Sequence, residues 1–358
     1  MQKNKTSVGG LRSGVRNIIS SIININMENL SNEIPAPTEL EKRRLRYLAN
    51  LDALQMSDME KIYPAEMKKR EWSEITDGAE IEKFRPKPLI VMNQIISKGL
   101  YGVFRDKNGE HTFIAPRLGK YSKIREILLD MLATAKEIAP WASAKGIGRT
   151  DDKMFEGDCG IWTFTGTIVQ YHPNSLENMV NGVGDDKYSV ENKQGFLREH
   201  VAAIVHENLH IHNEQDLNMG GPARTITETA PIMGEYLAFP DKNGKMKSLV
   251  QEAIQTLEQK QTGKRDLYVD ATLLGIIVAA SCDGTLPETE DLASIKEALE
   301  NWQKRVENLP PKELTVYRRK IEQEWLLSLN DEKLKSKLTE LKQTHPQLIE
   351  NLLEDFVW

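Results

Sequence analysis

The segment 205–210, Val-His-Glu-Asn-Leu-His, carries the clearest chemical pattern in the chain. His206 and His210 are four residues apart, and Glu207 directly follows the first of them. On a helix, residues four apart lie on one face, so both imidazoles can converge on a single metal ion. Glu207 lies about 100° round the helix from His206. That is the position of a general base that takes a proton from a metal-activated water.

A catalytic zinc ion takes three protein ligands and keeps one position open. Glu228 and Glu235 follow downstream, seven residues apart, so on a helix they share a face. We predict Glu228 as the third ligand because it is closer to the turn that brings the chain back. Pro231 suits a first helical turn, which predicts that Glu228 lies near a helix start. The alternative is that Glu228 binds no metal and only places a negative charge near the helix N-terminus, where it interacts favourably with the helix dipole.

Glu235 is predicted to orient a ligand histidine through the other ring nitrogen. The alternative is an ordinary solvent-facing carboxylate. Peptide hydrolysis also needs a donor to the oxyanion of the transition state. Tyr236 and Tyr268 are candidates for that donor, as are Tyr171 and His172.

This block resembles the gluzincin metallopeptidases, the group that includes thermolysin, aminopeptidase N and the thimet-type oligopeptidases. These enzymes share His-Glu-x-x-His on one helix and a glutamate ligand on the next. Here 17 residues (211–227) separate His210 from Glu228, close to the spacing of the aminopeptidase and thermolysin branches. The resemblance implies that His206, His210 and Glu228 bind one catalytic Zn²⁺ ion and that Glu207 is the base.

The resemblance covers only about residues 195–239. The chain contains no Gly-x-Met-x-Asn exopeptidase motif and no Asn-Glu-x-x-Ser-Asp block. No His-x-x-Gly-x-x-His continuation follows His210, which argues against the metzincins. The subfamily, and the choice between endopeptidase and exopeptidase, therefore remain open.

The elements that must position these residues predict an α+β fold that is predominantly helical. A helix over 194–217 would carry the motif, and a second, from near 225–229 to about 239, would carry the glutamates. A small mixed sheet beside the motif helix would include a hairpin over 101–114 and a strand over 161–171. That strand could pair with an extended substrate, or be an ordinary internal strand.

Further helices are predicted on both sides of this region. They cover 38–54, 57–76 with an interruption at Pro64, 90–98, 120–139 and almost all of 246–358. In the last region, apolar residues recur at steps of three and four, which we interpret as ordinary helix packing. The members of this stripe are Ile295, Leu299, Trp302, Val306 and Leu309.

Composition narrows the classes of protein. The net charge of −6 argues against a nucleic-acid binder. Two cysteines, Cys159 and Cys282, indicate free thiols in a reducing compartment, although one bridge is possible. No apolar run approaches the roughly 18 residues that a transmembrane helix needs. Residues 1–27 are basic and carry apolar side chains at helical spacing, so they are either a targeting or membrane-surface segment or a loose terminus.

We therefore predict three regions: a flexible or targeting segment (1–36), a zincin-like catalytic domain (37–245) and a helical subdomain (246–358). The predicted function is a zinc metallopeptidase that acts on a peptide or protein, with Glu207 as general base. The alternative is a non-enzymatic helical interaction module with a structural or vestigial metal site. A third reading is a zinc hydrolase with a non-peptide substrate. The predicted location is cytoplasmic; the alternative is an effector exported with residues 1–27 as its signal.

Overall fold

The computed structural model describes much of the chain after residue 60. The described residues are 61–83, 102–109, 111–115, 122–142, 146–149, 161–164, 168–171, 190–213, 222–240, 244–257, 266–327 and 332–353. All of them belong to one compact unit, residues 46–358. The predicted helices 38–54 and 90–98, and the segment 1–36, lie outside the described residues.

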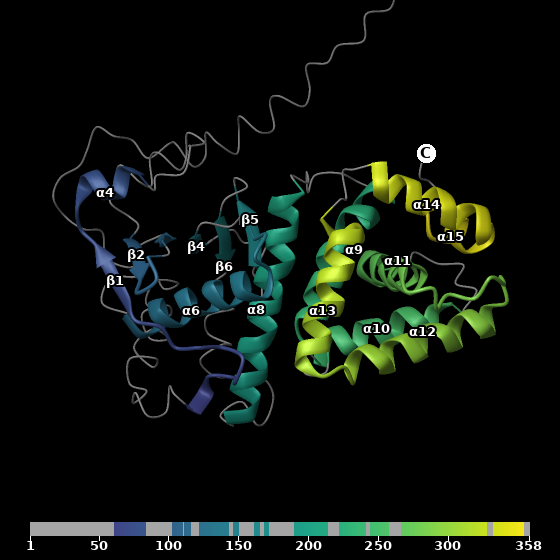
Figure 1. Cartoon of the computed structure of the whole chain (residues 1–358), viewed down its shortest axis with the longest axis horizontal. Coiled ribbons are helices and arrows are strands. Elements are labelled where there is room, and N and C mark those ends of the chain that lie inside the picture. Colours follow the sequence, from purple (N-terminus) through teal and green to yellow (C-terminus); the bar gives the residue numbers. More distant parts are fainter. Residues whose placement is uncertain are drawn as a thin grey trace, which may run out of the picture. The chain divides into compact units, whose positions relative to one another are not determined.

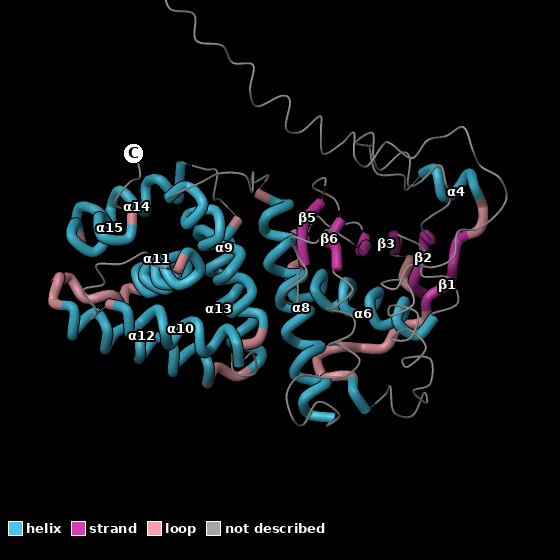
Figure 2. Tube along the Cα trace, turned by 180° about the vertical axis from the view of Figure 1, so that it is seen from behind, coloured by secondary structure: helices cyan, strands magenta, loops and turns pink. Residues whose placement is uncertain are grey.

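Six strands form one mixed sheet in the order β1-β2-β3-β4-β6-β5 (Figures 1 and 2). Strands β3 and β4 pair in parallel, as do β4 and β6, and the other neighbours are antiparallel. The predicted small mixed sheet is therefore present. The strands are β1 (Trp72–Ile75), β2 (Gly102–Asp106), β3 (His111–Ala115), β4 (Gly146–Arg149), β5 (Ile161–Phe164) and β6 (Ile168–Tyr171).

Strands β2 and β3 form the predicted hairpin. Asp106 ends β2, and its Oδ1 accepts a hydrogen bond of 2.8 Å from the backbone N–H of Asn108. Gly109 follows with φ of 84°, a left-handed conformation that glycine adopts without strain. The Asp-Lys-Asn-Gly sequence thus makes the turn that its residue types predict.

Two predictions about strands need correction. The predicted single strand 161–171 contains two antiparallel strands, Ile161–Phe164 and Ile168–Tyr171, with Ile161 opposite Tyr171. The Thr-Gly-Thr at 165–167 was a hairpin signal that the surrounding β-branched residues obscured. Of the predicted helix 57–76, only residues 61–62 are described as helical. Residues 63–71 are irregular, and Trp72–Ile75 form β1 because each pairs with a residue of β2.

Two helices, α8 and α9, carry the predicted metal ligands, and a third, α6, packs on α8. Helix α6 (Ser122–Ile138) confirms the prediction for 120–139. Helix α8 (Val190–His212) carries the motif and begins four residues earlier than predicted. Helix α9 (Pro222–Ala238) carries both glutamates. Figure 1 shows α8 beside α6, β5 and β6, and α9 beside α8, as the contacts between these elements require.

The predicted position of Pro231 was wrong. The residue lies inside α9, nine positions after the first residue of the helix, and not in a first turn. Glu228 is accordingly in the second turn. A proline ring removes one backbone N–H and crowds the preceding turn, which normally weakens a helix. Here α9 is held by burial: Pro231 and its neighbours from Thr227 to Gly234 are all buried.

Every regular element described after residue 243 is a helix, and turns such as 283–291 and 308–310 join these helices. The short helix α4 (Gly78–Lys83) follows β1. The C-terminal elements are α10 (Gly244–Thr256), α11 (Leu267–Cys282), α12 (Leu292–Glu307), α13 (Pro311–Ile321), the π-helix η2 (Glu322–Leu326), α14 (Glu332–Thr344) and α15 (Pro346–Leu352). The stripe residues of α12 are buried, and Leu309 packs against them, which confirms ordinary helix packing.

Buried apolar side chains form two clusters. The sheet-side core joins β2, α6 and most of α8, and includes Phe104, Leu132 and Val205. The helical core joins α9 to the C-terminal helices, and includes Leu209, Met233 and Trp302. Helix α8 therefore contributes to both. The predicted boundary at 245/246 stays a prediction, and α9 packs on α11 across it.

Candidate metal centre

Helices α8 and α9 position every predicted metal ligand. The apolar residues of α8 are buried in the two cores, which fixes the rotation of the helix and turns the motif face towards α9. On α9, Glu228 and Glu235 are seven residues apart and so lie on one face. Both carboxylates reach α8, because Glu228 contacts both histidines and Glu235 contacts His206.

The three predicted ligands converge on one position. The Nε2 atoms of His206 and His210 are 3.2 Å apart. Oε2 of Glu228 lies 3.4 Å from each of them. Among the described residues, this is the group of histidine, cysteine and acidic side chains that could hold a metal ion.

The size of this triangle fits a zinc ion. Zinc bonds to histidine nitrogen and carboxylate oxygen of about 2.0–2.1 Å, in tetrahedral geometry, require ligand atoms about 3.3 Å apart. The observed edges of 3.2, 3.4 and 3.4 Å match that value. Oε2 of Glu228 is buried and has no hydrogen-bond partner within the described structure. A cation between the three atoms would satisfy this oxygen.

Glu235 occupies the place that an orienting residue requires. Its Oε2 lies 3.1 Å from Nδ1 of His206, on the opposite side of the ring from the metal position. A carboxylate there favours the tautomer with the proton on Nδ1, which leaves the lone pair of Nε2 free for a metal. The solvent-facing alternative does not fit, since only 16% of the side chain is exposed.

Glu207 is buried beside the triad, with 8% of its surface exposed. Its Oε2 has no hydrogen-bond partner in the part of the chain that the structure describes. Burial raises the pKa of Glu207, although the nearby His206 and His210 oppose this. A carboxylate whose pKa is moved towards neutral is a better proton acceptor and donor for general acid–base chemistry.

The carboxylates also set the electrostatics of the ligands. Burial by itself lowers the pKa of His206, but contacts with Glu228 and Glu235 outweigh it and raise the pKa well above its ordinary value. Burial by itself raises the pKa of Glu228, but both histidines outweigh it and lower the pKa far below its usual range. Both shifts follow from the close contacts between imidazoles and carboxylates, and the carboxylates around His206 favour a positive charge there.

Comparison with protein-family models, known proteins and solved structures found no match. The gluzincin resemblance of the motif therefore stays a prediction, and the triangle of ligands is the evidence for metal binding.

The candidate oxyanion donors are placed as follows. Tyr236 is fully buried in the helical core, where its hydroxyl donates to Glu307 of α12 at 3.4 Å. This contact directs the hydroxyl towards α12 and weakens its predicted role. Tyr268 lies in the first turn of α11 and is 44% exposed, so its role stays a prediction. Tyr171 ends β6, and His172 lies outside the described residues.

One residue of the centre was missed by sequence reasoning. Gly234 packs so closely against Leu209 that an added Cβ atom would overlap Cδ1 of that leucine. The available signal was a glycine in the interior of a predicted helix, which often marks close packing.

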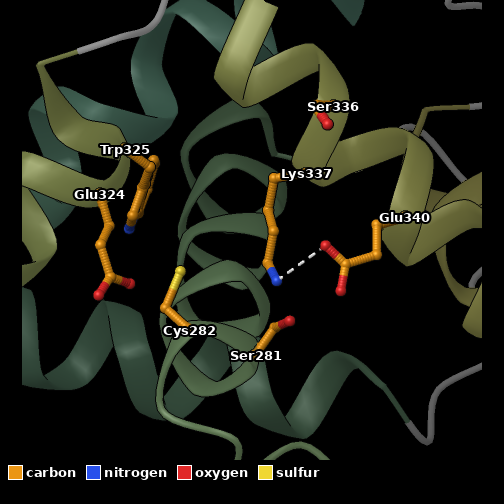
Figure 3. Close-up of a pocket in the computed structure, with 7 residues that line it drawn as sticks. All are labelled: Ser281, Cys282, Glu324, Trp325, Ser336, Lys337 and Glu340. Carbon is orange, nitrogen blue, oxygen red and sulfur yellow. Dashed lines mark hydrogen bonds and ion pairs between the residues drawn. The ribbon is translucent and has the colours of Figure 1, made fainter.

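A separate pocket of about 500 Å³ lies among α11, η2 and α14 (Figure 3). Cys282 lines it, and burial raises the pKa of its thiol to about 12, which keeps the thiol protonated. Lys337 points into the cavity and pairs with Glu340 at 3.2 Å. None of the lining residues comes from α8 or α9, so this cavity is distinct from the metal centre. The free state of Cys282 agrees with the predicted free thiol, and Cys159 lies outside the described residues.

Proposed function

We propose that this chain is a zinc-dependent metallopeptidase of the gluzincin type. The observation that supports the proposal most strongly is the triangle of His206, His210 and Glu228, with edges of 3.2–3.4 Å. The buried carboxylate of Glu207 beside it supplies the second requirement, a proton acceptor next to the metal position.

Each residue has a stated task in this mechanism. When bound, the zinc ion would act as a Lewis acid that activates water and polarises the substrate carbonyl. Glu207 accepts a proton from the attacking water and passes it to the leaving amine. Glu235 holds the ring of His206 in the ligand tautomer. Burial of the ligands limits competing water and strengthens these electrostatic effects.

The first experiment is elemental analysis of the purified chain and of a His206→Ala/His210→Ala variant. We expect about one zinc per wild-type chain and none in the variant. A wild-type chain that takes up no zinc near neutral pH would contradict the proposal.

The second experiment separates catalysis from structural metal binding. Glu207→Gln keeps the size of the side chain but removes the base. We expect it to bind zinc like the wild type while hydrolysis of a peptide library falls by about 10²–10⁴-fold. If the wild type binds zinc but cleaves no peptide, the site is a structural centre of an interaction module, or its hydrolytic substrate is not a peptide.

A further inference from the structure

We infer that Gly234 sets the separation of α8 and α9 and is therefore a positioning residue for the metal centre. The inference rests on the proposed metal site, because the distance that Gly234 controls is the one between the histidines of α8 and the carboxylate of α9. Its own evidence is the close approach of the two helices at this glycine.

The contact lies between the two sets of ligands. A Cβ atom on residue 234 would overlap Cδ1 of Leu209 and would lie 3.7 Å from Cγ1 of Val205. Leu209 directly precedes His210 and is three residues after His206. Gly234 directly precedes Glu235, which contacts His206. Any separation of the helices at this point therefore moves the ligands of α8 away from the carboxylates of α9.

Leu209 has little room to move out of the way. It is fully buried in the helical core, and buried side chains are packed at crystal-like density with few voids. The ligand triangle tolerates little expansion, because edges of 3.2–3.4 Å are already those of a zinc site. Increased helical separation would hence weaken metal binding before it disrupts the fold.

Glycine is otherwise a poor choice here. In a helix interior, alanine is more favourable than glycine by about 1 kcal/mol. Local helix propensity therefore predicts that Gly234→Ala would stabilise α9. A loss of zinc affinity in that variant must come from the contact between the helices and not from weaker helix formation.

The chain provides a matched control at the contact between α9 and α11. Gly275 of α11 packs against Met233, where an added Cβ would overlap Cγ, much as at Gly234, and would lie 2.8 Å from Sδ. Methionine is unbranched and adapts its shape more readily than leucine. Gly275→Ala therefore introduces the same methyl group against the same helix, but away from α8.

The test is a zinc titration of the full chain against a chromophoric chelator, with circular dichroism as a check on folding. We expect Gly234→Ala to weaken zinc binding by at least about tenfold, and Gly275→Ala to bind like the wild type. Leu209→Ala combined with Gly234→Ala should restore the affinity, since the shortened side chain leaves room for the methyl group.

Several outcomes would overturn the inference. Wild-type affinity in folded Gly234→Ala would do so, and so would equal losses in Gly234→Ala and Gly275→Ala. If Gly234→Ala does not fold, the comparison of Leu209→Ala with the double variant decides: equal affinity supports the inference, and weaker binding by the double variant contradicts it. A wild-type chain that binds no zinc would instead contradict the proposed function itself.

Discussion

The carboxylate of Glu235 lies 3.1 Å from Nδ1 of His206 and does not touch the metal position itself. Its effect on a metal must therefore pass through the imidazole. Residues in that role usually contribute ten- to a hundredfold to metal affinity. This distinguishes Glu235 from Glu228, whose oxygen is a corner of the ligand triangle.

We predict that Glu235→Ala retains one zinc site but weakens it by about 10–100-fold. The measurement is the zinc dissociation constant from chelator competition. Glu252→Ala, which removes an exposed carboxylate from α10, is the control for loss of negative charge alone. Similar small effects of both substitutions would show that Glu235 does not orient His206.

A second prediction concerns His200, which is buried and donates from Nδ1 to the carbonyl of Phe196 at 2.9 Å. Burial lowers its pKa to about 4, although the hydrogen bond to Phe196 opposes this. An unfolded histidine has a pKa near 6.5. The unfolded chain therefore binds the proton more readily, and stability falls as the pH drops from about 6.5 to about 4.

We expect this residue to contribute up to about 3 kcal/mol to the acid-induced loss of stability. The measurement is the free energy of unfolding at pH 7 and at pH 4.5, for the wild type and His200→Gln. The variant should lose less stability than the wild type over this interval. An identical loss in both proteins would contradict the assigned pKa.

At the scale of elements, a buried carboxylate attaches residues 63–72 to helix α6. Asp130 of α6 is fully buried and accepts hydrogen bonds from the Tyr63 hydroxyl at 3.0 Å and the Trp72 indole N–H at 2.8 Å. The backbone N–H of Arg70 donates to it at 3.2 Å. Three donors from residues 63–72, which run into the first residue of β1, thus converge on a single side chain.

Asp130→Ala should lower the free energy of unfolding by about 3 kcal/mol, because it leaves several buried donors without an acceptor. Urea denaturation would measure the change. Glu137→Ala is the control: it removes the 2.7 Å ion pair with Arg70, but half of that glutamate is exposed. A pair of this kind usually contributes less than about 1 kcal/mol, so equal losses would show that burial of Asp130 is unimportant.

The elements differ in how well sequence reasoning could place them. The β2–β3 turn was predictable because Asp106 and Gly109 act through local backbone chemistry. Helix α9 was misjudged at Pro231, since local preference places proline at a helix start, whereas tertiary burial keeps it inside α9. Strand β1 was also missed, because pairing with β2 is a long-range contact that local periodicity does not record.

The candidate site was more predictable than the fold around it. His206 and His210 could be paired from helical spacing alone, and Glu228 from its distance along the chain. The distance between α9 and α8 could not be predicted, because it depends on the packing of Gly234 against Leu209 across the helix interface. Composition could not indicate which tyrosine hydroxyl faces a substrate, since that depends on packing such as the Tyr236–Glu307 contact.

At the scale of the whole molecule, zinc would link α8 to α9 and favour the folded state. We predict that a free zinc concentration a hundredfold above the dissociation constant adds about 2.7 kcal/mol to the free energy of unfolding. Thermal melts with and without a chelator would measure this. The His206→Ala/His210→Ala variant should melt at the same temperature in both conditions, and a chelator effect on that variant would point to another site.

Among the described helices, none is long and apolar enough to cross a membrane. The C-terminal helices pack their apolar stripes on one another and on α9, so these stripes are interior surface.

Helix α8 has Val205 in the sheet-side core and Leu209 in the helical core. Because α8 contributes side chains to both cores, unfolding of one core would expose buried residues of the other. We therefore expect neither core to unfold alone. The backbone amides of α8 around residue 207 should then exchange with deuterium only when the whole compact unit opens. The amides of the motif would thus be among the slowest in the chain to exchange. A calorimetric scan should show a single unfolding transition for both cores.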